Sequence, residues 1–283
     1  MKLSGRVKFC GTQLDDLAPE IVIQGVDLGN SKENISAVDR LGGFGQRITG
    51  AHWQTLEASV TFGIDVPRTN LTRRMQIWDT VANWCANKAG WLSITFDGRE
   101  TNTIAAPQGK ALSVSNADYI AYMNKRMYAD KVIMPSPGDM YDWTKEFTII
   151  FRAYNIPFWQ DEVVTSAASG TAASGTINMT IPGRIKTPVD ITFQNKSGKT
   201  ISSFKVWTKL STITLTDISL GGSETITISH GTDGLMAIKK GSTSLYSKYT
   251  GSDDLLISPG KNYVKYEAER AGILTASVYG RYV

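Results

Sequence analysis

The 283-residue chain has little of the chemistry that enzymes use most often, with only two cysteines, Cys10 and Cys85, and two histidines, His52 and His230. Two cysteines so far apart in sequence form neither a disulfide framework nor a Cys-x-x-Cys metal knuckle. We expect both to be small buried hydrophobes in a protein of a reducing compartment. Histidines, cysteines and clustered carboxylates are the usual acids, bases and nucleophiles near neutral pH, so their scarcity disfavours an enzyme.

Long apolar runs are also missing. No stretch approaches the ~18 residues that cross a bilayer, and the opening segment MKLSGRVKFCGTQLDD lacks the apolar core of a signal peptide. We therefore expect no membrane insertion. A formal net charge of +4 is too small to indicate nucleic-acid binding. With 41% hydrophobic and 20% charged residues, the composition excludes wholesale disorder.

The length favours two domains, and three signals place their boundary near residues 165–176. This segment reads TSAASGTAASGT, a composition typical of a flexible linker. Up to Glu162 the chain has 17 Lys and Arg against 18 Asp and Glu, or −1, whereas the remainder has 13 against 8, or +5. Helical patterns become rare beyond it. We expect one domain over residues 1–164, a flexible linker over 165–176 and a second domain over 177–283.

The first half is patterned as strands with one helix. Apolar and polar residues alternate in AHWQTLEASVTFGID, WLSITFDGRE and KEFTIIFRAYNIPFWQ, and Asp97-Gly98 is a hairpin signal. The spacing predicts a helix from about Asn70 to Ala89, capped by Thr69 or Asn70 at its start and by a left-handed Gly90 at its end. The pattern indicates an antiparallel barrel or sandwich with one helix on its flank.

Two further features of this half are distinctive. The helix has a second apolar stripe, Ile77, Val81 and Trp84, beside its main one. Either both stripes form one wide face buried against a sheet, or the side with Ile77 and Trp84 meets another subunit. Residues 29–50 form the other feature, a glycine-rich excursion without clear period that joins two strands. Such segments are usually functional or flexible.

The second half carries short strand patterns separated by turns rich in Gly, Asn, Asp and Ser. About nine strands in about 110 residues indicate a two-sheet sandwich of jelly-roll type. Its aromatic residues include Trp207, Tyr246 and Tyr249. They would form either a ring for sugar stacking or ordinary core and cross-strand pairs, and both interpretations stay open.

Motif searches find no reactive constellation. Gly42-Gly43-Phe44-Gly45 lacks the spacing of a dinucleotide or phosphate loop, and no Gly-x-Ser-x-Gly elbow or His-Glu-x-x-His occurs. We expect His52 and His230 to be surface or core-edge histidines. The pairs Asp15-Asp16 and Asp253-Asp254 would point to opposite faces of a strand and could not act together. We expect no catalytic residue, no metal site and no cofactor.

In their order along the chain, these segments resemble the distal tail proteins of siphophages and prophages, over nearly the whole length. The resemblance is carried by the N-terminal strand with its glycine-rich segment, by the helix, and by WLSITFDGR, FTIIFRAYNIPFWQDE, MTIPGRIKTPVDITFQNKSGKT, LLISPGKNYVKY and GRYV. It implies a mainly-β fold, with an N-terminal tail-tube-like β-sandwich or barrel flanked by one α-helix. It also implies a C-terminal galectin-like β-sandwich of jelly-roll type.

The resemblance further implies a structural virion component and no enzyme. A hexameric ring would join the tail tube to the tail tip or baseplate, contacting the tail-tube protein, a tail-tip protein and a receptor-binding protein. DNA would pass through its channel without specific binding, which suits a first half of charge −1. The protein would be assembled in the host bacterial cytoplasm and would reside in the virion at the tail tip.

The resemblance implies that residues 29–50 are a ring-forming arm reaching a neighbour, and together with the patterns above it gives the candidate contact residues. The candidates for the oligomer interface are Arg40, Phe44, Arg47, Ile77 and Trp84, and those for a ligand or partner are Trp207, Tyr246 and Tyr249. Two alternatives stay open: a carbohydrate-binding host-recognition protein acting through the second sandwich, and a tail-tube subunit. Trp207 has no nearby His or Arg in sequence, which a galectin-type sugar site would need.

Overall fold

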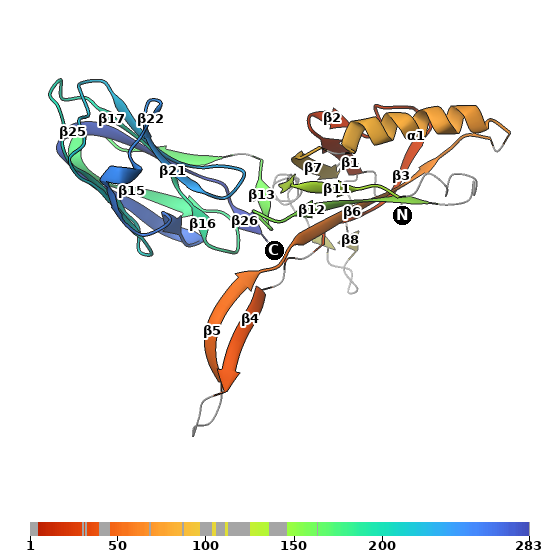
Figure 1. The fold of residues 1–283 in the computed structure, drawn as a ribbon, viewed down its shortest axis with the longest axis horizontal. Coiled ribbons are helices and arrows are strands. Elements are labelled where there is room, and N and C mark those ends of the chain that lie inside the picture. Colours follow the sequence, from red (N-terminus) through yellow and green to blue (C-terminus); the bar gives the residue numbers. More distant parts are fainter. Residues whose placement is uncertain are drawn as a thin grey trace. The chain divides into compact units, whose positions relative to one another are not determined.

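The computed structural model describes residues 5–29, 31, 33–39, 46–67, 69–86, 88–96, 104–105, 111–112, 125–135, 146–162 and 164–282. Within these ranges the protein is mainly β with one α-helix, as the sequence predicts (Figure 1). The chain divides into two compact units, Met1–Trp159 and Gln160–Val283. No helix of the described ranges is long and apolar enough to span a bilayer.

The first unit contains two antiparallel sheets. In one, the neighbouring strands are β2 (Thr12–Gln13), β1 (Gly5–Phe9), β7 (Gly90–Phe96) and β10 (Lys125–Ala129). In the other, they are β11 (Lys131–Ile133), β12 (Phe147–Ala153), β6 (Leu56–Ile64) and β3 (Ile21–Asp27). Two short pairs complete it: β4 (Glu33–Asp39) with β5 (Gln46–Trp53), and β8 (Ile104–Ala105) with β9 (Ala111–Leu112).

The alternation predicted for two of these strands is confirmed. Every second residue of β6 and β12 is buried, and the two strands pair so that Phe62 lies opposite Phe147 and Ala58 opposite Phe151. Each strand therefore presents one apolar face to the core and one polar face outward. The predicted hairpin at Asp97-Gly98 lies outside the described residues.

Helix α1 (Leu71–Cys85) packs on this core. Asn70 is its N-cap, with the side-chain Oδ1 accepting a hydrogen bond from the backbone N–H of Arg73 at 3.1 Å. The helix ends earlier than predicted, because Ala86 is already extended and leads the chain toward β7. Gly90 is therefore the first residue of β7 and not a left-handed cap.

The buried face of α1 contains the second stripe together with Trp78 and Cys85 of the main one, whereas the start of the main stripe, Leu71 and Met75, is exposed. Ile77 and Trp84 are 1% and 6% exposed. The Trp84 ring meets the rings of Phe9 and Phe151 at centroid distances of 5.8 and 6.4 Å, and its Nε1–H donates to the carbonyl of Thr12 at 3.1 Å. Side chains held in the core this way are not available to another subunit, so their assignment to the oligomer interface is wrong.

The two cysteines differ from each other. Cys85 is fully buried, and burial raises the pKa of its thiol to about 12. Cys10 is exposed, in a left-handed conformation with φ of 50° at the turn between β1 and β2. The expectation of two buried thiols is therefore correct only for Cys85, because the turn that carries Cys10 faces solvent.

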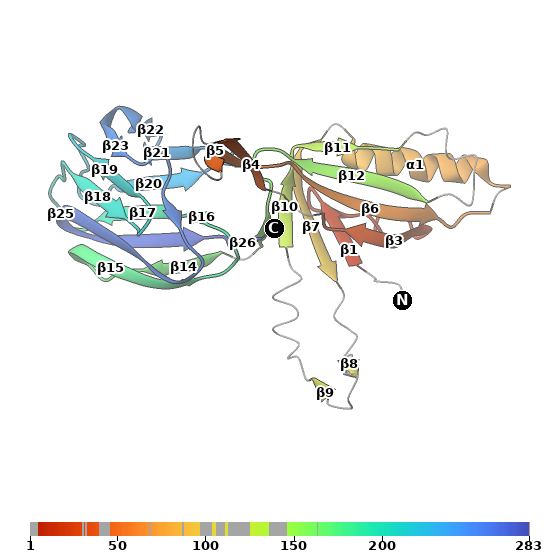
Figure 2. The same ribbon diagram turned by 90° about the horizontal axis from the view of Figure 1, so that it is seen from below.

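The second unit is built around one long strand, β25 (Gly260–Val278). Along one edge of β25 run β14 (Thr165–Ala168) and β15 (Ala172–Ile181), one after the other (Figure 2). Along its other edge, the N-terminal part pairs with β18 (Phe204–Trp207) and the C-terminal part with β17 (Asp190–Asn195). One strand therefore belongs to both layers of a sandwich.

The remaining strands extend the two layers. From β18 the first continues through β19 (Thr212–Leu215) to β23 (Tyr249–Gly251). From β17 the second continues through β20 (Thr225–His230) and β21 (Met236–Lys240) to β22 (Thr243–Ser244). The shorter elements are β13 (Trp159–Asp161), β16 (Thr187–Pro188), the 3-10 helix η2 (Tyr246–Lys248), β24 (Leu256–Ile257) and β26 (Arg281–Tyr282).

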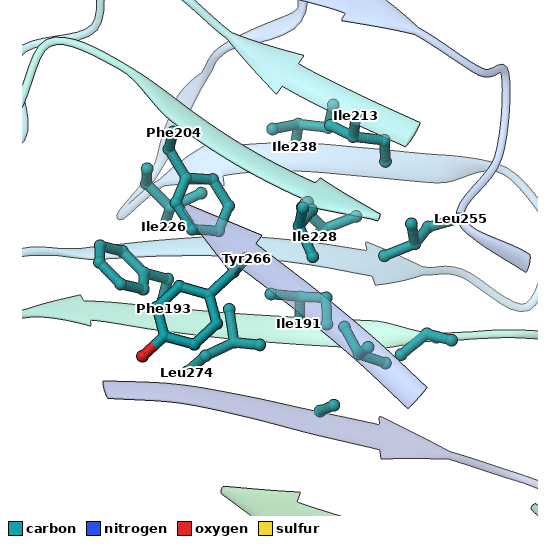
Figure 3. Close-up of a cluster of buried hydrophobic side chains, with 14 of the residues drawn as sticks. Ile191, Phe193, Phe204, Ile213, Ile226, Ile228, Ile238, Leu255, Tyr266 and Leu274 are labelled. Carbon is teal, nitrogen blue, oxygen red and sulfur yellow. The ribbon is translucent and has the colours of Figure 1, made fainter. Parts of the chain in front are cut away.

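The inner faces of the two layers enclose an apolar core (Figure 3). Phe193 of β17 lies between Phe204 of β18 and Tyr266 of β25, at ring-centroid distances of 4.6 and 5.9 Å. Even-numbered residues of β25 face this core on both sides of Arg270, which is exposed. The same face of β25 thus serves both layers.

The flexible linker expected at residues 165–176 is absent, because this segment forms β14 and the first half of β15. Two of its small residues lie against Tyr266. A Cβ on Gly175 would lie 2.8 Å from the ring of Tyr266, and Ser169 Oγ lies 3.1 Å from the Tyr266 hydroxyl. At Gly175 a side chain is disfavoured because a large buried ring occupies the space beside the strand.

Gly272 of β25 generates a prediction. A Cβ at this position would lie 2.6 Å from the backbone O of Gln194 and closer still to the ring of Phe193. Gly272→Ala should therefore destabilise the protein by about 2 kcal/mol, because the core must shift to accept one methyl group. Gly170→Ala is the matched control, since a Cβ there meets nothing within 4 Å. Urea unfolding of both variants checks this, and equal stabilities would contradict it.

Candidate functional site

Strands β4 and β5 form a two-stranded ribbon over the glycine-rich excursion. They pair antiparallel from Glu33 opposite Trp53 to Asp39 opposite Gln46, with a register shift at Ser36 and Ala37. Among the described strands they pair with no other. Figure 1 shows the ribbon extending away from the two sheets of its unit. The sequence of residues 29–50 shows no periodicity typical of a strand or a helix. In the structure, much of this segment nevertheless forms the strands β4 and β5.

The base of the ribbon is fixed to the first unit. Ser31 Oγ donates to the carbonyl of Gln54 at 3.0 Å, and the ring of Trp53 packs edge-on against Phe158 at 5.1 Å. Next to it, Trp159 Nε1–H donates to the carbonyl of Leu28 at 2.8 Å. These contacts hold the base in place and leave both edges of the ribbon available for pairing.

An isolated two-stranded ribbon is marginally stable in water, and unpaired strand edges are templates for another chain. Of the residues predicted for the interface, Arg47 lies in β5 opposite Val38. Arg40 and Phe44 lie outside the described residues, as do the glycines beside Phe44. The ribbon is therefore a candidate interface on the basis of its backbone.

The aromatic residues predicted for a ligand do not form one site. Tyr246 and Tyr249 meet edge-on at 6.0 Å, and each hydroxyl donates to a backbone carbonyl, of Met236 and Ser252 respectively. Tyr249 packs against the core. Trp207 is on the outer face of its sheet, because its neighbour Val206 is buried in the core. A common sugar-stacking ring of these three residues is excluded.

Trp207 belongs instead to a surface that we call the lysine face. It lies on the outer side of β15, β25 and β18. The Nζ of Lys205 lies 5.2 Å from the Trp207 ring centre, and Lys265 and Lys209 lie 4.9 and 5.5 Å from that of Tyr263. The sequence already indicated this surface. Residues two apart on a strand lie on the same face, which groups Lys205 with Trp207 and Lys261 with Tyr263 and Lys265.

A second feature that the motif search missed is a charged cluster around His230. Its Nδ1 lies 2.8 Å from Asp190 Oδ1 and its Nε2 lies 2.5 Å from Asp254 Oδ1. The His230 side chain is only 6% exposed. Burial alone lowers the pKa of His230, but the two carboxylates outweigh it and raise the pKa from its ordinary 6.5 to about 9. His230 is therefore a cation at neutral pH.

Arg281 completes the cluster. Burial lowers the pKa of its guanidinium to about 10, while the charges of Asp254 and Asp190 oppose this. Two cations and two carboxylates thus balance at neutral pH. Because both ring nitrogens of His230 already face a carboxylate, it is suited neither to a metal nor to general-base work. No group of three or more metal-ligating side chains occurs among the described residues. We interpret the cluster as structural.

Comparisons with known proteins give a likeness of fold. No protein-family model matches the chain, and no curated protein matches it in sequence. A solved structure, the Dit protein of phage SPP1, is described as a paradigm of the hub adsorption apparatus in phages that infect Gram-positive bacteria. It matches with a TM-score of 0.58 at 11% identity, over 97% of this chain and 98% of that one. A chain of the phage P2 baseplate in its activated, calcium-bound conformation has a TM-score of 0.46, at 10% identity and 98% coverage of each.

The cluster around His230 predicts a pH dependence of stability. Because the folded-state pKa is raised, its contribution is complete below pH 6.5 and is lost as the pH rises through about 9. The difference in unfolding free energy between the native chain and His230→Gln should fall by on the order of 2–3 kcal/mol between about pH 6 and pH 9.5. Urea unfolding across that range measures it.

The matched control is Asp253→Asn, which neutralises the carboxylate next to Asp254 in sequence. It should leave the pH dependence of the native chain unchanged, whereas Asp254→Asn should reduce it. A difference between the native chain and His230→Gln that stays constant from about pH 6 to 9.5 would show that the cluster does not stabilise the charged histidine.

Proposed function

We propose that this chain is a structural component of a siphophage or prophage tail, a distal tail protein that forms a ring between the tail tube and the tail tip. The observation that carries the proposal is the likeness of fold to the SPP1 hub protein over nearly the whole chain. The order of sequence segments that resembles distal tail proteins supports it independently. In this role the protein acts by assembly and not by catalysis.

The ribbon β4–β5 is the element that we assign to ring formation. A ring closes when one surface of each subunit meets a different surface of the next. The ribbon is suited to be one of these two surfaces. Its base is anchored at Trp53 and Ser31, while its edges pair with no other described strand. Pairing with a neighbour would also supply the stability that an isolated ribbon lacks.

The charge of the first unit fits a channel for DNA. Residues 1–159 carry 17 Lys and Arg against 16 Asp and Glu, or +1. Each phosphate that a basic side chain neutralises adds affinity, so a strongly basic lumen would hold the DNA back. We propose that one side of the ring contacts the tail-tube protein and the other the tail-tip and receptor-binding proteins, with DNA passing without specific binding.

Removal of the ribbon tests the ring. Asn34 and His52 are paired in register, so an Asn-Gly turn can join them in place of residues 35–51. The native chain should form rings in light scattering and negative-stain images, whereas this variant should be monomeric. The variant should still unfold cooperatively in urea, because the anchored base, including Trp53, is kept, although its midpoint loses any contribution of ring assembly.

Two outcomes would contradict the proposal. Intact rings of the shortened chain would show that the ribbon is not the ring-forming element. A native chain that stays monomeric at high concentration would show that it does not form a ring by itself. As a further control, Leu235→Ser changes an exposed side chain of the second unit, 68% exposed, and should leave the rings intact.

A further inference from the structure

The lysine face carries a net positive charge. The outward side chains of β15, β25 and β18, with Lys209 from the turn after β18, include four lysines and two carboxylates, Glu267 and Glu269. Four positive charges and two negative charges give +2 on the side of a single sheet. The face also presents hydroxyl and amide side chains on β15: Thr176, Asn178 and Thr180, all of them exposed.

The two aromatic rings of this face hold the lysines in place. Lys205 lies over Trp207, while Lys265 and Lys209 both lie over Tyr263. An exposed cation–π contact is worth about 0.5–1 kcal/mol, enough to keep a flexible ammonium group on the face. The same contacts cover the rings, so neither a nucleic-acid base nor a sugar can stack on them without displacing a lysine.

The spacing of the charges suits a polymer better than a single ion. Lys261 and Lys265 are four residues apart on an extended strand, or about 13 Å by its rise. Lys265 lies opposite Trp207 on β18, and Lys205 is two residues farther along that strand. Asn178, Thr180, Lys261, Asn262 and Tyr263 also line an open depression of about 360 Å³ at the β15 edge. Charges spread this way match an extended chain with regularly repeated anions.

We propose that the lysine face binds an anionic polysaccharide whose charges are phosphate diesters, as in a chain of polyol phosphates. Lysine is a compact point charge that pairs well with phosphate, and the face carries no arginine fork for carboxylates. The exposed Thr and Asn side chains on β15 supply hydrogen bonds for hydroxyl groups of the polymer. The proposal does not depend on ring formation, since the whole face lies within one sandwich.

The experiment is a titration of the full chain by calorimetry with a purified glycerol-phosphate polymer. We expect binding that weakens as salt is raised, because exposed charges carry it. The double variant Lys261→Glu/Lys265→Glu should reduce the affinity at least about tenfold. Two attractive contacts with phosphate are lost, and each is replaced by repulsion between two negative charges. Tyr263→Leu should reduce it about two- to threefold, because Lys265 and Lys209 lose the ring that positions them.

The matched control is Lys196→Glu/Lys239→Glu, which makes the same change of net charge on exposed lysines elsewhere in the unit. Its affinity should stay within about twofold of the native value. Neutral dextran should not bind, and single-stranded DNA should bind at least about tenfold more weakly than the glycerol-phosphate polymer. Each variant is first shown to have the native urea midpoint.

Three results would overturn the proposal. The first is no binding of the glycerol-phosphate polymer at low salt. The second is an equal loss of affinity in the lysine-face variant and in the control pair, which would mean attraction by net charge alone. The third is binding of single-stranded DNA as tight as that of the polymer, which would assign the face to polyanions in general.

Discussion

Successive side chains of a β-strand point to opposite faces, and both units of this protein are arranged to cover the apolar face of their sheets. In the first unit, Trp78 and Trp84 of α1 pack on Phe147 and Phe151 of β12. In the second unit no helix does this, and a second layer of strands takes its place. Within that unit Phe193, Phe204 and Tyr266 pack together where the layers are joined.

This constraint explains which parts of the fold could be predicted from sequence. Alternation is a local signal, so the buried residues of β6 and β12, and of β20 with its threonines, follow from it. The segment at residues 165–176 could not be assigned in this way. The segment pairs with β25, and its Gly175 lies beside the Tyr266 ring, but both are distant from it in sequence. Composition alone does not separate a flexible segment from one that pairs as a strand.

The candidate sites also divide into one that a local sequence pattern indicates and one that only the folded chain brings together. The lysine face was predictable, because the strand period places Lys205 with Trp207 and Lys261 with Tyr263 and Lys265 on one side. The cluster of Asp190, His230, Asp254 and Arg281 was not, since strand pairing and loops join residues that are far apart in the chain. The assignment of Ile77 and Trp84 failed for a related reason. The width of an apolar stripe does not tell how much of it the protein's own core covers.

Strand β25 has a consequence for how the second unit carries force. Its backbone hydrogen-bonds to β17 and β14 at one end and to β18 and β15 at the other, so both layers share one covalent strand. Pulling one layer away from the other therefore loads peptide bonds and whole ladders of hydrogen bonds, in addition to side-chain packing. The sandwich should stretch little before it breaks, transmitting tension across its width as a stiff link does.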